Sequence, residues 1–171
     1  MPSLPLNDQR WSELSARCGP AGFVSDAIKH LLNHPDDLEA FDRLSGELTC
    51  ENTTWPAAYA AAPYIVETAR RLSPEQRLKH MIIIGYMAYS ESSPPSGKLE
   101  KPAYLAESYE QALRDCLPLL AQTLLCQHTA EETRYLLASA AALKGYRNLG
   151  EVLEGLDCGC PHCGEEILER E

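Results

Sequence analysis

The residues with the clearest capacity for chemistry lie near the C-terminal end of the sequence. Three cysteines, Cys158, Cys160 and Cys163, gather there around a proline and two glycines. Thiolates separated by two residues across such a turn bind Zn²⁺, and a closed structural site needs four ligands. His162 is adjacent to Cys163 and points elsewhere unless the turn is strained, so the fourth ligand would be Cys50, another histidine, water or a second subunit. We therefore interpret the three tail cysteines as candidate zinc ligands, with an acidic tail that binds no metal as the alternative.

The other four cysteines show no pattern of disulfide pairing or nucleophilic chemistry. The total of seven is odd and no export signal accompanies them, so reduced thiols are expected. Cys116 follows Leu113 on an apolar helical stripe and is predicted to be a small core residue. No base neighbours the remaining three, which are Cys18, Cys50 and Cys126.

The histidines and acidic pairs do not form a catalytic set. His30 and His34 are four residues apart and can share one helix face, as in a two-histidine metal site. They lack the glutamate of a His-Glu-x-x-His motif and precede Pro35, so we interpret them as cations near a helix end. The pairs Asp36–Asp37 and Glu131–Glu132 stand at expected helix starts, where negative charge is stabilised. Without a nucleophile, a base and an oxyanion site, the sequence predicts a protein that is not an enzyme.

Charge and hydropathy restrict the expected partners. The 171 residues include 25 acidic and 15 basic side chains, which gives a net charge of -10. Such a field repels nucleic acid on average and favours a protein partner with a basic face. The longest apolar runs, such as Met81–Tyr89, are too short to span a membrane, and residues 1–10 contain no signal-peptide pattern. A cytoplasmic protein with neither a membrane nor a nucleic acid as partner is expected.

The elements that must position these residues are predicted to be helices. In residues 54–89, apolar side chains recur every three or four positions on both sides of a turn. Ser73 and Gln76 predict a capping box, with Pro74 at the first helical position. We expect a helical hairpin here, and strand patterns are absent from the sequence. The apolar positions of the hairpin are Trp55, Tyr59, Ala62, Val66, Ala69, Leu72, Leu78, Ile82, Gly85, Tyr86 and Tyr89.

Amphipathic patterns predict further helices before the hairpin. One helix is expected around residues 8–17, and a second ends at Pro35. Asp36 or Asp37 begins a third. The apolar stripes of the second and third helices are expected to face the core, and they consist of Phe23, Ala27, Ile28, Leu31 and Leu32, followed by Leu38, Phe41, Leu44 and Leu48.

The second half of the chain repeats this helical character. A polar loop over residues 90–101, rich in serine and proline, separates the two halves. A long helix follows it, and Thr129 with Glu132 predicts a capping box for the next helix, which ends at Gly145. One more short helix is expected, with apolar positions at Leu149, Val152, Leu153 and Leu156.

The predicted helices form three antiparallel pairs. Each pair begins about forty to fifty residues after the last, which is the spacing of HEAT-like or armadillo-like repeats. The sequence therefore predicts an all-α fold, a short α-solenoid of antiparallel helix pairs, as a single domain over residues 1–157. Residues 158–171 form a cysteine-containing acidic tail. A closed helical bundle uses the same periodicities and is the alternative architecture.

A family resemblance points the same way. The run Thr54–Glu67, in which a Trp-Pro step and a row of alanines lead to Pro63, resembles the central helix of bacterial HEAT-like repeat proteins. Residues 138–145 and the final Cys-Pro-x-Cys-Gly pattern are similar to the ends of such proteins. The likeness covers about residues 38–165 and is broken at Cys50-Glu51-Asn52, where a polar His-Gln-Gly step is expected. The family is largely uncharacterised, so the resemblance implies a helical scaffold and assigns no catalytic residue.

The expected function is binding. Stacked helices without a catalytic set suit a protein-interaction or scaffold module, such as a bacterial accessory or immunity-type protein. Another protein, with a basic face, is the expected partner. The alternative is a small zinc-binding regulatory protein, in which Cys158, Cys160 and Cys163 hold the metal and fix the last helix or a dimer. Apart from this zinc, no cofactor is expected.

Overall fold

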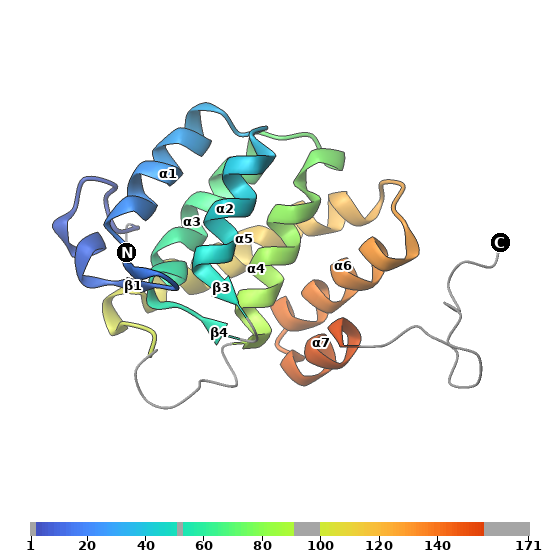
Figure 1. Cartoon of the computed structure of the whole chain (residues 1–171). Helices are drawn as coiled ribbons and strands as arrows, with labels where there is room; N and C mark the ends of the chain where they lie inside the picture. Colours follow the sequence, from blue (N-terminus) through green and yellow to red (C-terminus); the bar gives the residue numbers. More distant parts are fainter. Residues whose placement is uncertain (1–2, 51–52, 91–99, 156–171) are drawn as a thin grey trace.

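The fold is all-α, as the sequence predicts. The computed structural model describes residues 3–50, 53–90 and 100–155. Seven α-helices account for most of these residues (Figure 1), and short 3-10 turns directly precede two of them, α4 and α5. The helices are α1 Gly22–Asn33, α2 Leu38–Leu48, α3 Pro56–Arg70, α4 Leu78–Ser90, α5 Ala106–Leu124, α6 Ala130–Leu143 and α7 Arg147–Glu154.

Two short β-hairpins correct the expectation that strands are absent. Strand β1 (Ser15–Ala16) pairs with β2 (Gly19–Pro20), and β3 (Thr49–Cys50) pairs with β4 (Thr53–Thr54), both antiparallel. A helix around residues 8–17 was therefore a wrong prediction, because only a 3-10 turn over Gln9–Glu13 forms there. Ladders of two residues are too short to produce an alternating pattern of side chains, so the sequence gives no signal for them.

The helix boundaries follow the local signals in the sequence. Asp37 caps α2 by accepting a hydrogen bond from the Ala40 backbone N–H at 2.9 Å. The capping box of Thr129 and Glu132 begins α6, and Gly145, with φ of +90°, follows its end. The box predicted at Ser73 is only half made, because the Gln76 side chain accepts from the Ser73 backbone N–H while a 3-10 turn precedes α4.

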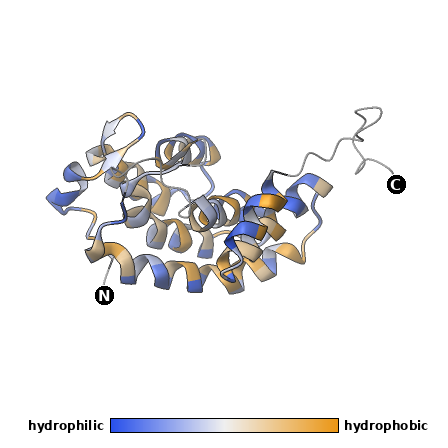
Figure 2. Cartoon of the chain, turned by 90° about the horizontal axis from the view of Figure 1, so that it is seen from below, coloured by the Kyte–Doolittle hydropathy of each residue, from blue (hydrophilic) through white to orange (hydrophobic). Residues whose placement is uncertain are grey.

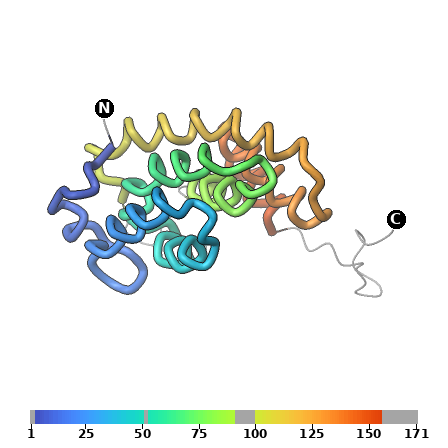
Figure 3. Tube along the Cα trace, turned by 90° about the horizontal axis from the view of Figure 1, so that it is seen from above, coloured from blue at the N-terminus to red at the C-terminus, as the bar shows by residue number. Residues whose placement is uncertain are grey.

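The helices pack side by side, with α3 and α4 at the centre. Helix α3 packs against both α1 and α5, while α4 packs against α6 and α7. Figure 3 shows α5 along one side of the molecule, with α3 and α4 between it and the first two helices. Figure 2 shows hydrophobic and hydrophilic residues alternating along the helices, as amphipathic helices require. The all-α fold is confirmed, and the division into HEAT-like repeats stays a prediction.

Small residues allow the last helices to pack closely. A Cβ added to Gly85 of α4 would overlap Ser139 of α6, including its backbone. A Cβ added to Gly150 of α7 would lie 2.9 Å from the carbonyl oxygen of Ala138. Helix α3 is rich in alanine, and its alanines are almost fully buried. Within the described ranges, no helix is both long and apolar enough to cross a bilayer.

Candidate functional site

The predicted zinc ligands Cys158, Cys160 and Cys163 lie outside the described residues. The fourth ligand considered for them, Cys50, is half-buried at the end of β3 and has a free thiol. In residues 3–50, 53–90 and 100–155, no three histidine, cysteine or acidic side chains come together as a metal site. The zinc site therefore stays a prediction.

Three thiols within the described ranges, those of Cys18, Cys116 and Cys126, lie in environments that raise their pKa. Cys116 is buried, with its Sγ 3.6 Å from the Met81 Sδ, and burial raises its pKa to about 12. The Glu47 carboxylate accepts a hydrogen bond from the Cys18 side chain and raises the pKa of that thiol. Burial and the Glu75 carboxylate do the same for Cys126. A nucleophilic cysteine needs the opposite environment, in which positive charge stabilises the thiolate.

The two neighbouring histidines of α1 do not assemble a metal site. The ring centroids of His30 and His34 are 4.9 Å apart. The His30 Nε2 lies 2.8 Å from Asp37 Oδ2, and the same aspartate caps α2. This contact joins the end of α1 to the start of α2, so its structural role is to fix the turn between the two helices.

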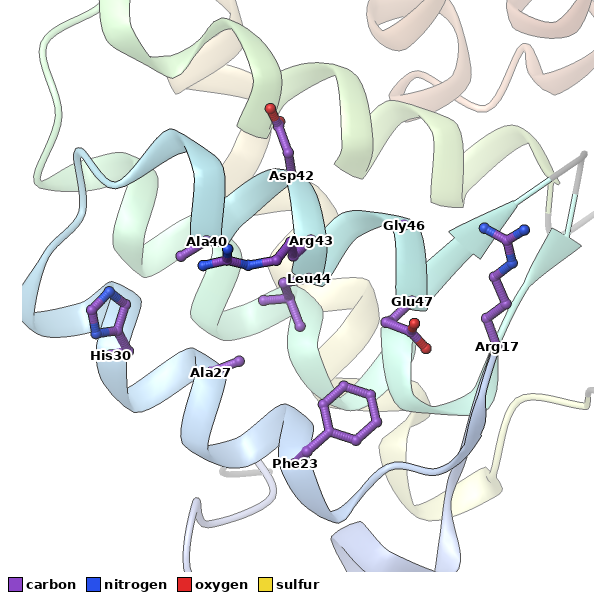
Figure 4. Close-up of a pocket in the computed structure, with 10 residues that line it drawn as sticks. All are labelled: Arg17, Phe23, Ala27, His30, Ala40, Asp42, Arg43, Leu44, Gly46 and Glu47. Atoms are coloured by element: carbon purple, nitrogen blue, oxygen red, sulfur yellow. The ribbon is translucent and has the colours of Figure 1, made fainter.

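A groove lies between α1 and α2. It has a volume of about 680 Å³ and is drawn in Figure 4. Its floor is apolar and consists of Phe23, Ala27, Ala40 and Leu44. Figure 4 shows these side chains meeting between the helices, with His30 at one end and Arg17 with Glu47 at the other. We refer to this hollow as the α1–α2 groove.

The groove exists because its lining residues are short where the two helices face each other. Ala27 and Ala40 carry only a methyl group, and a Cβ added to Gly46 would meet nothing within 4 Å. The sequence predicts that Phe23 lies on the buried stripe of its helix, and this was wrong, because its side chain is 45% exposed. The buried line of α1 is Val24, Ile28 and Leu31, and Phe23 and Ala27 lie along its flank.

Most of the charges on the groove rim are paired with their own neighbours. Arg43 contacts Glu39 at 2.7 Å, and Asp42, which points away from the groove in Figure 4, contacts Lys79 of α4. The remaining acidic group, Glu47, accepts a hydrogen bond from the Cys18 backbone N–H at 3.1 Å. The rim is therefore close to electrically neutral, although the whole chain carries a net charge of -10.

Arg17 is the exception on this rim. Its backbone N–H donates to the Glu47 carbonyl oxygen at 2.9 Å, which fixes the β1–β2 turn against α2. Among the described residues, no side chain forms an ion pair or a hydrogen bond with its exposed guanidinium. The groove thus combines an apolar floor with one cation and one carboxylate, Arg17 and Glu47, that form no ion pair among the described residues.

A second, smaller hollow lies between α3 and α5 and has a volume of about 300 Å³. Its charged groups neutralise one another, because Arg70 contacts Asp115 at 2.8 Å and Gln111 donates to the same carboxylate at 2.7 Å. The hydrogen bond that the Arg70 guanidinium donates lowers the pKa of Asp115. A ligand in this hollow would have to compete with these contacts, so the α1–α2 groove is the better candidate site.

Helix α7 carries an exposed apolar stripe. Tyr146 is 67% exposed, and Leu149 and Val152 are 50% and 58% exposed, at intervals of three residues. The sequence predicts this short helix correctly, but only Gly150 is fully buried in it.

His80 is a buried titratable group behind the groove. Its ring, which is fully buried, stacks on Phe41 of α2 with the centroids 3.9 Å apart. Within the described part of the chain, neither ring nitrogen has a hydrogen-bond partner. Burial lowers the pKa of His80 to about 4, so the ring is neutral at pH 7.

Sequence reasoning did not single out the groove as a site, although His30, which it weighed as a metal ligand, lies at one end of it. The candidates that it named were cysteines and histidines, whereas the groove depends on two alanines, one half-exposed ring and one arginine. A comparison of the chain with protein-family models, with curated proteins and with solved structures finds no significant match. The resemblance to HEAT-like repeat proteins stays a prediction.

Proposed function

We propose that the chain is a non-enzymatic protein-interaction module that uses the α1–α2 groove as its docking surface. The observation that carries this proposal is the partly exposed Phe23 ring on an apolar floor between two helices. Covering a side chain of this size contributes roughly 1.5–3 kcal/mol when it passes from full exposure to full burial, so about half of that is available here. An amphipathic segment of a partner obtains its binding energy in grooves of this kind.

The wider role that we propose is that of a cytoplasmic bacterial accessory or immunity-type protein. The net charge of -10 supports a partner with a basic face, because long-range attraction speeds the encounter. The packing of α1 on α3 and of α3 on α5 supports a scaffold in which helix pairs stack. The alternative zinc-binding regulator depends on Cys158, Cys160 and Cys163, and no observation among the described residues favours it.

The test fills the groove and compares the captured partners. Ala27→Arg places a long side chain on the floor, and Ala121→Arg, on the exposed face of α5, makes the same change away from the groove. Each chain is used to capture proteins from a native lysate, which are then quantified by mass spectrometry. The proposal predicts that the partner captured by the wild type persists with Ala121→Arg and is lost with Ala27→Arg. Identical captured sets for the two variants would refute it, provided that both have the same helical circular dichroism.

A further inference from the structure

The buried ring of His80 lies at the contact between α2 and α4, behind the α1–α2 groove. We propose that His80 is a pH switch, in which a proton on its ring releases α2 from α4 and so destabilises the groove in acid. The release of α2 follows from the packing of His80, whereas its consequence for docking rests on the proposed function. His80 is a positioning residue in this proposal, because it acts through the place of α2.

The neutral ring fits its site and a charged ring does not. His80 is fully buried, and its ring stacks on Phe41 of α2 with the centroids 3.9 Å apart. Among the residues that the structure describes, neither ring nitrogen has a hydrogen-bond partner. A buried cation needs an opposite charge or hydrogen bonds to replace the water that it loses. The protonated ring is therefore stable only where water reaches it, which requires Phe41 and α2 to move away.

No charged group on the described elements around α4 compensates a proton on His80. Burial alone accounts for its lowered pKa, without a contribution from a neighbouring charge. The residues of β3 and β4 are uncharged, and burial keeps the Cys116 thiol of α5 neutral by raising its pKa to about 12. Glu151 and Glu154 of α7 lie near Tyr89, at the other end of α4. The remaining charged groups already have partners, which are Asp42 with Lys79, Glu67 with Arg70 and Arg71, Asp115 with Arg70, Glu131 with Arg134, Glu132 with His128, Glu75 with the Cys126 thiol, and Arg77 with the Leu72 carbonyl oxygen and the Gln122 side chain.

Helix α2 is the side of this contact that can move. It lies at the edge of the helical layers, with α3 and α4 between it and α5 in Figure 3. Its buried side chains are Phe41, Leu44 and Leu48, whereas α4 packs against α3, α5, α6 and α7. Elements that bury few side chains open at a lower free energy than the whole fold. Water can therefore reach His80 through an opening of α2 while the other helices stay packed.

The start of α2 is a joint that holds in acid. Asp37 caps α2, and its Oδ2 lies 2.8 Å from the His30 Nε2 of α1. The pKa of Asp37 is lowered, first by the Ala40 backbone N–H and then by His30, so the carboxylate stays ionised to a lower pH than a free one. A proton on His30 has Asp37 as its partner, whereas a proton on His80 has none. Acid thus keeps α2 joined to α1 and weakens its contact with α4.

The experiment is native-state hydrogen exchange of the full chain, measured by mass spectrometry at pH 7, 6, 5 and 4 and at urea concentrations below the unfolding transition. Backbone amides of α2 are compared with those of α5 after correction for the intrinsic exchange rate. The proposal predicts an opening of α2 that depends little on urea, because it exposes little surface, while α5 exchanges through global unfolding. The opening constant of α2 should rise about twentyfold between pH 7 and pH 5, and about a hundredfold by pH 4.

The variants assign this rise to one ring. His80→Phe and His80→Leu cannot take up a proton, so both should remove most of the rise between pH 7 and pH 4. The two replacements differ in shape, so a folding defect in one of them, seen by circular dichroism, leaves the other to decide. His34→Phe is the matched control, because it removes an exposed histidine of α1 and should open like the wild type.

Three results would overturn the proposal. An α2 opening constant that does not rise in acid would show that the ring is not the switch, and a rise that persists in both His80 variants would assign it to another group. Exchange of α2 and α5 with the same urea dependence at every pH would show that α2 opens only with the whole fold. The measurement uses no partner, so its failure leaves the docking function to the capture experiment with Ala27→Arg. If that capture experiment fails while α2 opens in acid, the docking function is wrong and the switch stands.

Discussion

Replacing His80 by phenylalanine should remove a pH dependence from the stability of the fold. The buried ring stacks on Phe41, and neither nitrogen has a partner within the described residues. Burial lowers its pKa from 6.5 to about 4 in the folded chain. The unfolded chain therefore binds a proton between these pH values that the folded chain does not, and the free energy of unfolding falls as the pH falls. Phenylalanine keeps an aromatic ring against Phe41 and cannot take up a proton.

The size of the effect follows from the shift in pKa. A depression from 6.5 to about 4 corresponds to a loss of about 3 kcal/mol in the free energy of unfolding when the pH is lowered from 7 to 4. About 2 kcal/mol of this loss should already appear at pH 5. A typical domain has only about 5–15 kcal/mol of stability, so this one ring carries a substantial share of the acid sensitivity.

The assay is urea unfolding of the wild type and His80→Phe at pH 7, 5 and 4, followed by the fluorescence of the buried Trp11. Carboxylates such as Asp8, whose pKa is lowered to about 2 mainly by the side-chain hydrogen bond to Arg10, change with pH in both proteins and cancel in the difference. His80→Leu is the control for packing, because it has a different shape and the same lack of a proton. Both variants should gain about 3 kcal/mol relative to the wild type between pH 7 and pH 4. Curves that stay parallel at all three pH values would refute the burial of a neutral ring at this position.

Three further predictions follow from the packing and the tail. Gly85→Ala should destabilise the fold by about 1–3 kcal/mol, because the added methyl group overlaps Ser139. Gly46→Ala has open space around it and should stabilise α2 by up to about 1 kcal/mol. Equal urea midpoints for the two variants would contradict the close contact between Gly85 and Ser139. Thr129→Ala should cost about 1 kcal/mol by removing the cap of α6, also measured by urea unfolding, and no change would mean that the capping box contributes nothing. If the three tail cysteines bind zinc, protein purified without a chelator should contain stoichiometric zinc by elemental analysis and lose it on Cys160→Ser, while metal-free protein would remove the zinc hypothesis.

The sequence could predict those features that depend on residues close together in the chain. The caps at Asp37 and Thr129 and the helix end at Gly145 each involve partners within a few residues, and the structure contains all three. The buried thiol of Cys116 was also predicted, because the apolar stripe that contains it repeats with the period of a helix. Features of this kind involve residues that are close together in the chain, so the sequence alone is enough to predict them.

The groove could not be predicted, because its shape depends on the distance between two helices. Phe23 has the spacing of a core residue, and the periodicity of α1 alone does not show that its flank faces an opening. The same reasoning misplaced Leu38 of α2, which is 43% exposed. The pairing of Asp42 with Lys79 joins residues 37 positions apart, and no local pattern indicates it. That Arg17 and Glu47 form no ion pair among the described residues becomes visible only once these pairings are known.

The groove and the buried histidine are linked through α2. One side of this helix contributes Ala40 and Leu44 to the groove, and its Phe41 ring rests on His80. A peptide that binds only the folded chain must raise the free energy of unfolding, by RT ln(1 + [L]/Kd). At a concentration of about one hundred times Kd, the gain is about 2.7 kcal/mol, which is close to the loss expected from protonation of His80 at pH 4. Occupation of the groove at low pH should therefore restore to the wild type most of the stability that His80→Phe gains without a ligand.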